Sequence, residues 1–167
     1  FTDLDETLLR QNKYCNKTLQ NFIMKLLRYE YLIIPVTSKT YVEVINILKQ
    51  IKFKIPFSVE NGGACYIPIK NTRSYKYKKI LNPYAINKEI IKKILNKNIF
   101  KKYSHNIEFI ENLSFSKQKK ITKLNYNQLE NFNSREYTIP ILWHGDKNLK
   151  KEFEISLLKY KLKIVFG

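Results

Sequence analysis

The sequence predicts an α/β fold with parallel strands, followed by a second unit of mixed α+β structure. In the first part of the chain, short apolar runs typical of buried strands alternate with segments of helical periodicity. From about residue 70 a polar, tyrosine-rich stretch leads into further short helices and strands. A chain of 167 residues is long enough for two small domains, which we place at residues 1–70 and 71–167.

The first part alternates strands with helices. Residues 2–9 begin within a strand, and because Phe1 is not a start methionine we expect the chain to be truncated at its front. Strands are predicted over residues 32–36 and 56–59, and helices over residues 18–29 and 42–48. The turn Glu60–Gly63 ends the third strand, and residues 64–67 are expected to return as a hairpin arm. Since open α/β sheets bind ligands at the carboxyl ends of their strands, the residues after each strand are the candidates for chemistry.

The second part reads as a folded module rather than a linker. Helices are predicted over residues 86–95, 126–132 and 150–160, and strands over residues 107–110, 139–143 and 162–166. We expect Trp143 to lie in the core of this part. His105 and His144 have no partner at a metal-ligand spacing, so we expect them to be structural or exposed.

The chain is strongly basic, with 31 Lys and Arg against 14 Asp and Glu and a net charge of +17. The basic residues are scattered, and they accompany abundant Asn, Ile, Tyr and Phe, a bias typical of an AT-rich genome. We therefore expect no nucleic-acid partner. No apolar run reaches the roughly 20 residues of a membrane span, so no membrane association is expected. With no signal peptide evident and only Cys15 and Cys65, a cytoplasmic location is expected.

The segment Asp3-Leu4-Asp5-Glu6-Thr7 places two carboxylates two residues apart at the end of a strand. In such a pair, one carboxylate can act as a nucleophile while the other donates and accepts protons. The alternative is a capping turn, because Asp and Thr are common where helices begin. The chain has only one further aspartate, Asp146, which favours a functional role for the adjacent pair.

Two more strand ends carry candidate residues. Thr37, Ser38 and Lys39 follow the second predicted strand, and Asn61 and Gly62 follow the third. A glycine allows the backbone to approach a ligand closely. A plain turn is the alternative for the residues after the third strand.

Several of these segments resemble a known family. Phe1–Leu9 resembles the first motif of the haloacid dehalogenase-like phosphohydrolases, and Pro35–Thr40 resembles their second motif, a strand followed by Thr or Ser. The longer pattern of Pro35–Thr40 with Glu43, followed by Pro56–Ala64, is similar to mannosyl-3-phosphoglycerate phosphatases. Arg135–Asp146 resembles a cap segment of the same group.

The resemblance implies a partial Rossmann-like core with an inserted α+β cap and a Mg²⁺-dependent hydrolysis of a sugar phosphate, mannosyl-3-phosphoglycerate. By motif position, Asp3 attacks phosphorus to form an aspartyl-phosphate, Asp5 protonates the leaving oxygen and activates water, and Thr37 binds the phosphoryl group. Asp3 and Asp5 also ligate Mg²⁺. The other predicted substrate contacts are Thr7, Ser38, Lys39, Asn61 and Gly62. For Lys39, a solvated lysine at the helix start is the alternative.

The sequence departs from the family pattern at two places. Glu6 stands where this family commonly has Gly. The family pattern continues into a lysine and a Gly-Asp-x-x-Asn-Asp loop that completes the Mg²⁺ site, whereas this chain stops at Gly167, and Gly145–Asn148 matches that loop only in part. We therefore expect weak or no phosphatase activity from this chain alone. A phosphatase for another sugar phosphate and a non-catalytic remnant stay open as alternatives, and the oligomeric state is not predicted.

Overall fold

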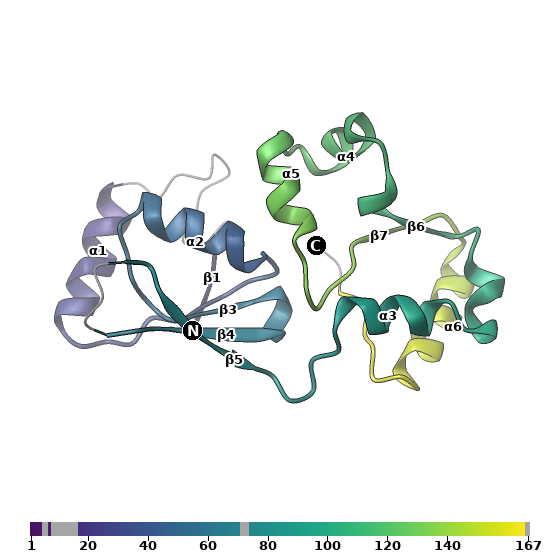
Figure 1. Ribbon diagram of the computed structural model, residues 1–167, viewed down its shortest axis with the longest axis horizontal. Helices are drawn as coiled ribbons and strands as arrows, with labels where there is room; N and C mark the ends of the chain where they lie inside the picture. Colours follow the sequence, from purple (N-terminus) through teal and green to yellow (C-terminus); the bar gives the residue numbers. More distant parts are fainter. Residues whose placement is uncertain (5–6, 8–16, 71–73, 166–167) are drawn as a thin grey trace. The chain divides into compact units, whose positions relative to one another are not determined.

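The computed structural model describes residues 1–4, 7, 17–70 and 74–165, and these form two compact units (Figure 1). Unit 1 comprises Phe1–Ile86 together with Glu130–Thr138, and unit 2 comprises Asn87–Leu129 together with Ile139–Gly167. The chain thus leaves unit 1 after Ile86 and returns to it once, at residues 130–138. The predicted division into a core and a cap at residue 70 stays a prediction.

Unit 1 is built on a five-stranded sheet in the order β1-β2-β3-β4-β5. Its strands are β1 (Thr2–Asp3), β2 (Pro35–Val36), β3 (Phe57–Val59), β4 (Ala64–Pro68) and β5 (Tyr77–Leu81). β1, β2 and β3 are parallel, which confirms the sheet predicted from the alternation of strands and helices. β4 returns antiparallel to β3 as the predicted hairpin arm. β5, antiparallel to β4, was not predicted, because its sequence Tyr-Lys-Lys-Ile-Leu lacks a strict apolar alternation.

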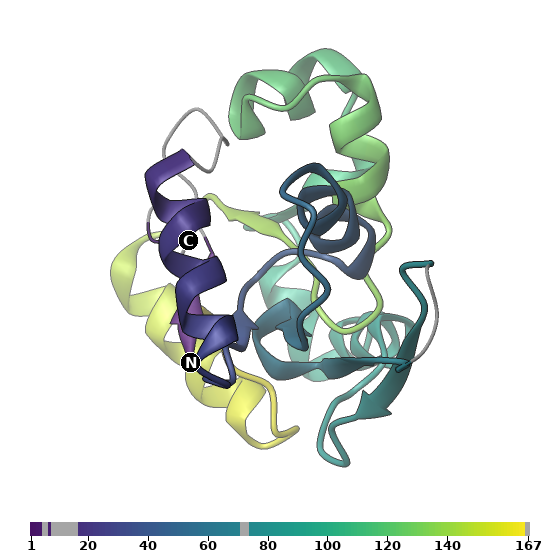
Figure 2. The same cartoon turned by 90° about the vertical axis from the view of Figure 1, so that its left-hand side faces the viewer.

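Two amphipathic helices, α1 (Lys17–Arg28) and α2 (Tyr41–Gln50), pack against this sheet. Figure 2 shows the molecule from the side of α1. Ile23 of α1 and Leu48 of α2 are buried in one apolar cluster with Phe57 of β3. Both helices confirm the predicted helical spacing. Their apolar faces pack in the same cluster as the sheet and so stabilise its short parallel strands.

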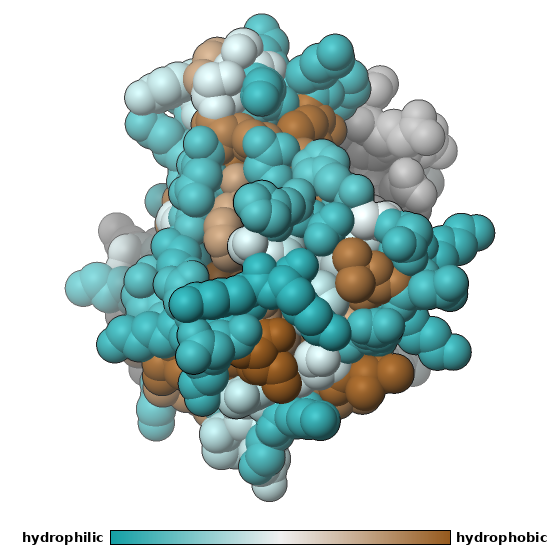
Figure 3. Space-filling view, turned by 90° about the vertical axis from the view of Figure 1, so that its right-hand side faces the viewer, coloured by the Kyte–Doolittle hydropathy of each residue, from teal (hydrophilic) through white to brown (hydrophobic). Residues whose placement is uncertain are grey.

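Unit 2 packs around an aromatic cluster. Its elements are α3 (Lys88–Leu95), η2 (Asn98–Tyr103), β6 (Ile107–Phe109), η3 (Ile110–Asn112), α4 (Phe115–Thr122), α5 (Tyr126–Asn133, whose last residues belong to unit 1), β7 (Ile141–Trp143) and α6 (Lys147–Leu158). Phe100, Tyr103 and Phe153 are buried, and Trp143 stacks on Phe153 with ring centroids 5.3 Å apart, as its expected core position requires. β6 and β7 form a two-stranded antiparallel sheet. The surface drawn in Figure 3 is mostly hydrophilic, and its apolar residues form several small patches.

Two features of unit 2 differ from the prediction. The strand predicted over residues 162–166 is wrong for its described part, because residues 162–165 are irregular. Leu162 and Ile164 instead pack against the aromatic cluster, and the Leu162 N–H donates to the Leu157 carbonyl at 3.1 Å. The helix α4 was missed because it buries a polar side chain, Gln118, whose amide donates to the Leu113 carbonyl at 2.8 Å. The strand predicted over residues 32–36 is also shorter than expected, because β2 spans only Pro35–Val36.

None of the helices in the described ranges is long and apolar enough to cross a membrane. Cys65 is a free, exposed cysteine of β4, and Cys15 lies outside the described residues. The cytoplasmic location expected from the cysteine content stays a prediction.

Candidate active site

The carboxyl ends of the three parallel strands lie at one edge of the unit 1 sheet. β1 pairs with β2 through Asp3 and Val36, and β2 pairs with β3 through Val36 and Ser58. Neighbouring strands are about 4.8 Å apart, so the residues that follow Val36 start next to Asp3. The Asp3 side chain is exposed, and its Oδ1 accepts a hydrogen bond from the Leu4 N–H at 2.6 Å. Asp3 therefore presents a carboxylate at the edge where open α/β sheets bind ligands.

The loop after β2 leads directly into α2. Thr37 is buried, and its Oγ1 accepts a hydrogen bond from the Lys39 N–H at 3.2 Å, which leaves the hydroxyl proton available for donation. Thr40 is the N-cap of α2 in a capping box: its Oγ1 accepts from the Glu43 N–H, and the Glu43 carboxylate accepts from the Thr40 N–H. Ser38 is exposed and Lys39 is partly buried. The loop thus places a hydroxyl, a lysine and a helix N-terminus beside β1, a combination that favours anions.

The turn after β3 is hydrogen-bonded to this loop through the backbone. The Asn61 N–H donates to the Thr37 carbonyl, and the Glu60 N–H donates to the Lys39 carbonyl, both at 3.0 Å. Asn61 and Gly62 have φ values of 57° and 94°, in the left-handed region that Gly adopts most easily. The structure therefore brings together the predicted residues of two loops: Thr37, Ser38, Lys39, Asn61 and Gly62.

A buried carboxylate holds a distant segment of unit 1 against this turn. Glu60 is only 3% exposed, and its Oε1 accepts a hydrogen bond from the Glu136 N–H at 2.9 Å. Its Oε2 accepts from the N–H groups of Tyr137 and Thr138 at 2.9 Å each and from the Thr138 hydroxyl at 2.8 Å. These four donors replace the water that a buried carboxylate loses. Residues 136–138 are consequently fixed at the end of β3.

Arg135 connects the same segment to the loop after β2. Its Nη1 donates to the Ser38 carbonyl at 2.8 Å and to the Thr138 hydroxyl at 2.9 Å. Burial lowers the pKa of the Arg135 guanidinium, while the nearby carboxylates of Glu43 and Glu60 act in the opposite direction. An arginine remains charged at neutral pH despite such a shift. The edge therefore contains a fixed, partly buried positive charge.

Further contacts fix Glu136 and Tyr137. Lys79 of β5 forms an ion pair with Glu136, and the Tyr137 hydroxyl donates to the same carboxylate at 3.0 Å. Burial opposes a charge on Lys79, but hydrogen bonds with Glu136 and Tyr137 outweigh it and raise the pKa of the lysine. The Tyr137 ring lies against Gly63, where an added Cβ would come within 2.7 Å of three Tyr137 carbons. Close approach of the segment therefore requires a glycine at this position.

The remaining predicted site residues are less well placed. Asp5 and Glu6 lie outside the described residues, and Thr7 is an exposed turn residue. Within the described ranges, no group of three or more His, Cys, Asp or Glu side chains is arranged to hold a metal ion. The exposed Asp3 carboxylate nevertheless offers the hard oxygen donor that Mg²⁺ prefers, so the donor chemistry at this edge fits that ion.

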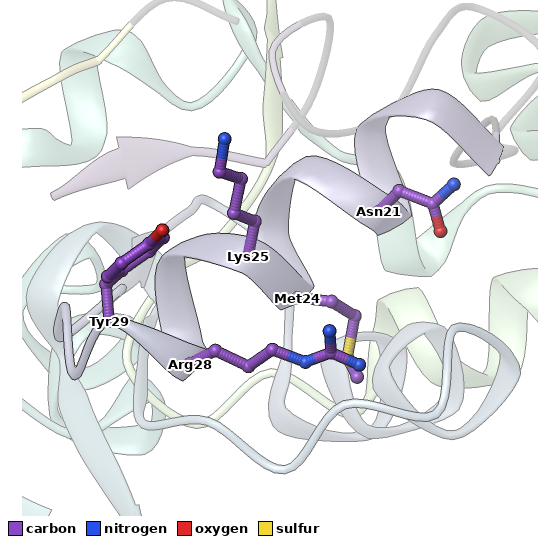
Figure 4. Close-up of a pocket in the computed structure, with 5 residues that line it drawn as sticks. All are labelled: Asn21, Met24, Lys25, Arg28 and Tyr29. Atoms are coloured by element: carbon purple, nitrogen blue, oxygen red, sulfur yellow. The ribbon is translucent and has the colours of Figure 1, made fainter.

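Two other regions, the start of α6 and a hollow on α1, contain polar or charged side chains but none of the predicted site residues. Asp146 is the N-cap of α6, and its Oδ1 accepts a hydrogen bond from the Leu149 N–H at 2.8 Å, which explains Gly145–Asn148 as a helix start. A shallow hollow on the outer face of α1 is lined by Asn21, Met24, Lys25, Arg28 and Tyr29 (Figure 4). In that view the Arg28 side chain extends along the helix toward Met24. Both regions are separate from the carboxyl edge in sequence and in residue content.

The roles of Glu60 and Arg135 were not predicted from the sequence. Glu60 was expected only as part of a turn, and Arg135 as part of a segment that resembles a cap; in the structure Arg135 lies in unit 1, and the division into core and cap stays a prediction. One signal was present: Glu60 directly follows β3, all three of whose residues are buried. An acidic residue in that position needs several donors, although the sequence does not say which segment supplies them.

The fold and this edge define an α/β protein of the open-sheet class, with a carboxylate at the end of the first strand and a threonine in the loop between the second strand and its helix. Residues 1–163 match the model of the haloacid dehalogenase-like hydrolase family, and the chain belongs to this family. The family resemblance of the sequence motifs is thereby confirmed.

The chain is similar to individual proteins in sequence or in fold. The chain is 30% identical over 166 residues to a glucosyl-3-phosphoglycerate/mannosyl-3-phosphoglycerate phosphatase of Persephonella marina, covering 93% of this chain and 59% of that protein. A crystal structure from Thermotoga maritima has a TM-score of 0.56 at 20% identity, covering 95% of this chain and 61% of that one. A haloacid dehalogenase-like hydrolase from B. subtilis has a TM-score of 0.50 at 18% identity, covering 95% and 65%. The chain thus spans about three fifths of the length of these relatives.

Proposed function

We propose that this chain carries the nucleophile and the phosphoryl-binding loop of a Mg²⁺-dependent phosphatase that acts on mannosyl-3-phosphoglycerate. The observation that carries the proposal is the position of Asp3 on the strand next to the one that leads into Thr37–Lys39. Membership of a hydrolase family supports the class of reaction. The name of the Persephonella marina relative supports the substrate, and it makes glucosyl-3-phosphoglycerate the second candidate.

In the proposed reaction, a carboxylate oxygen of Asp3 bonds to phosphorus while the bond between phosphorus and the substrate oxygen breaks. Asp5 gives its proton to the leaving oxygen. Water then attacks phosphorus of the aspartyl-phosphate, Asp5 takes a proton from that water, and inorganic phosphate leaves as Asp3 is released. Asp3 and Asp5 are the residues that would hold Mg²⁺, which supplies positive charge to offset that of the phosphate.

The loop after β2 is suited to hold the transferring group. The Thr37 hydroxyl accepts from Lys39 and can donate its own proton to a phosphoryl oxygen. Ser38 is exposed and lies two residues before the N-cap of α2, close to a helix start, where anions are stabilised. Lys39 adds a positive charge for the glycerate carboxylate, and we assign Thr7, Asn61 and Gly62 to the substrate side of the site.

The first test is anion binding, because it does not depend on a complete metal site. The chain is titrated with inorganic phosphate in the presence of Mg²⁺ while the amide signals of Ser38 and Lys39 are followed by NMR. We expect saturable shifts at these amides and smaller shifts at α6. Absence of any saturable change at residues 37–39 would contradict the proposal.

The second test concerns the reaction and its substrate. Phosphate release is measured with mannosyl-3-phosphoglycerate, glucosyl-3-phosphoglycerate and an unrelated sugar phosphate. We expect slow Mg²⁺-dependent release, lowered by about 10³-fold or more in Asp3→Asn, because the nucleophile is removed. Asp146→Asn is the matched control, since Asn also caps a helix, and it should retain the rate of the wild-type chain. Measurable Mg²⁺-dependent release that is equal for Asp3→Asn and the wild type would exclude Asp3 as the nucleophile.

A further inference from the structure

All three carbonyl groups of the loop at residues 37–39 accept hydrogen bonds from residues outside the loop. The Thr37 carbonyl accepts from the Asn61 N–H at 3.0 Å and the Lys39 carbonyl from the Glu60 N–H at 3.0 Å. The middle carbonyl, of Ser38, accepts from Arg135 Nη1 at 2.8 Å. Two of these donors belong to the turn after β3, and the third comes from a segment nearly 100 residues further along the chain.

Glu60 connects these donors to one another. Its backbone N–H bonds the loop, while its carboxylate accepts the N–H groups of Glu136, Tyr137 and Thr138. Arg135 directly precedes those three residues. The Glu60 carboxylate therefore fixes the backbone from which the Arg135 side chain extends. The Thr138 hydroxyl links the two side chains directly, because it donates a hydrogen bond to Glu60 and accepts one from Arg135. The Arg135 guanidinium also lies over the Phe132 ring, 4.5 Å from its centroid, which restricts its position further.

The direction of the loop carbonyls matters for an anion. A carbonyl oxygen repels a phosphoryl oxygen, whereas an N–H attracts it, so a binding loop must turn its carbonyls away. The residues that hold them adopt an unusual backbone: Glu60, Asn61 and Gly62 have φ values of 49°, 57° and 94°. Such left-handed backbone in two consecutive residues other than Gly persists only where surrounding bonds determine it.

We infer that Glu60 and Arg135 are positioning residues of the phosphoryl-binding loop, holding the carbonyls of Ser38 and Lys39 away from the anion. This inference rests on the proposed function for the purpose of the loop, but not for its geometry. Neither residue needs to touch the substrate. Their effect is exerted through the conformation of residues 37–39.

The geometry is tested first by hydrogen exchange of the free chain. Glu60→Gln replaces one carboxylate oxygen with an N–H₂ group that faces N–H donors, and Arg135→Met removes the donor to Ser38. We expect the amides of Lys39, Glu60 and Asn61 to exchange about tenfold faster in both variants. Arg135→Lys keeps a donor of the same charge and should restore part of the protection.

The control variant is Glu136→Gln, which changes a carboxylate of the same segment whose partners among the described residues are Lys79 and the Tyr137 hydroxyl. We expect its loop amides to exchange as in the wild type. The Val44 amide, which bonds the carbonyl of the N-cap Thr40 in the first turn of α2, reports opening of this helix. If Glu60→Gln and Arg135→Met leave the loop amides unchanged, or accelerate them only as much as Val44, the positioning role is refuted.

Phosphate binding then tests whether the conformation of residues 37–39 matters for binding an anion. With inorganic phosphate and Mg²⁺ as the probe, we expect the affinity to fall about tenfold in Glu60→Gln and to stay at the wild-type value in Glu136→Gln. Wild-type affinity in a Glu60→Gln variant whose loop amides exchange faster would overturn the inference. No phosphate binding by the wild-type chain would refute the proposed function instead, and the exchange data would still decide the geometry.

Discussion

The two units are stabilised by different kinds of interaction. Unit 2 depends on a compact aromatic cluster in which Phe100, Tyr103 and Phe153 pack against one another with ring centroids 5.1 to 6.4 Å apart. Unit 1 also has an apolar core, but its carboxyl edge is held by buried polar bonds around Glu60. Apolar packing is not directional, whereas a buried carboxylate is stable only when hydrogen-bond donors face its oxygens with the right geometry. The difference indicates that unit 2 is built for stability and that the edge of unit 1 is built for a defined loop geometry.

The largest expected effect comes from opening the aromatic cluster. Phe153 is 1% exposed and contacts three other rings, so Phe153→Ala should lower the free energy of unfolding of unit 2 by about 4 kcal/mol. Trp143 is the single tryptophan of the chain and stacks on Phe153, which makes its fluorescence a probe of this unit. Urea titration followed by Trp143 fluorescence measures the change.

The matched control for this variant is Leu158→Ala, on the same helix but 60% exposed, which should cost less than about 1 kcal/mol. Hydrogen exchange at Val44 reports unit 1 in parallel. If Phe153→Ala accelerates exchange at Val44 as strongly as at amides of α6, the two units unfold as one, and the contrast between them would not hold for stability.

The next effect concerns the close approach of Tyr137 to the turn after β3. Gly63→Ala introduces a Cβ within 2.7 Å of three Tyr137 carbons and should destabilise unit 1 by about 2 kcal/mol. Exchange rates of the Tyr137 and Thr138 amides, which bond Glu60, measure the loss. Gly62→Ala is the comparison, since no atom of the described residues lies within 4 Å of an added Cβ there, and the positive φ of Gly62 opposes the change. We expect about 1 kcal/mol for that variant, and an equal or larger cost would show that backbone strain dominates over the Tyr137 contact.

These contacts also mark the boundary of what the sequence could predict. The helical spacing of α1 and α2 and the parallel strands were predictable, because burial imposes local periods of 3.6 and 2 residues. The meeting of Asp3 with the Thr37 loop followed from topology, since parallel strands end at the same edge. Glu60 and Arg135 were not predictable as partners of the loop, because their bonds join residues 76 to 97 positions apart and depend on how residues 130–138 return to unit 1. Asp5 remains a prediction, as it lies outside the described residues.

A smaller effect compares the N-caps of the two units. Thr40 is 1% exposed, and its hydroxyl both accepts from the Glu43 N–H and donates to the Asn131 carbonyl at 2.9 Å. Thr40→Ala should therefore destabilise unit 1 by about 1.5 kcal/mol. Asp146 caps α6 at the exposed surface, and Asp146→Ala should destabilise unit 2 by about 0.5 to 1 kcal/mol. Exchange at Val44 and Trp143 fluorescence measure the two changes, and Thr40→Ser, which keeps the hydroxyl, should recover most of the loss. A larger effect for Asp146→Ala would reverse the order that the buried bonds of unit 1 predict.

The smallest expected effect depends on pH and belongs to unit 2. Glu111 accepts hydrogen bonds from Lys92 at 2.8 Å and from Lys88 at 3.0 Å. Partial burial opposes its ionisation, but these bonds outweigh burial and lower the pKa of the Glu111 carboxyl below its ordinary value of 4.5. Since the folded-state pKa is the lower one, the stabilisation is complete above pH 4.5 and is lost as the pH falls through the folded-state pKa. Glu111→Gln should destabilise unit 2 by about 1 kcal/mol or less at pH 7, with the difference from the wild type vanishing in acid.

Glu152→Gln separates this effect from general charge repulsion in a basic chain. The ion pair of Glu152 with Lys102 is exposed on both sides, with 60% and 56% of the side chains accessible. Its removal changes the net charge by the same amount as Glu111→Gln, yet solvent screening leaves the pair little to contribute. Urea midpoints from Trp143 fluorescence at several pH values should therefore differ between the two variants at neutral pH and converge in acid. Identical midpoints at pH 7 would mean that the loss of one negative charge accounts for both, and that polar bonds contribute to unit 2 no more than its surface pairs do.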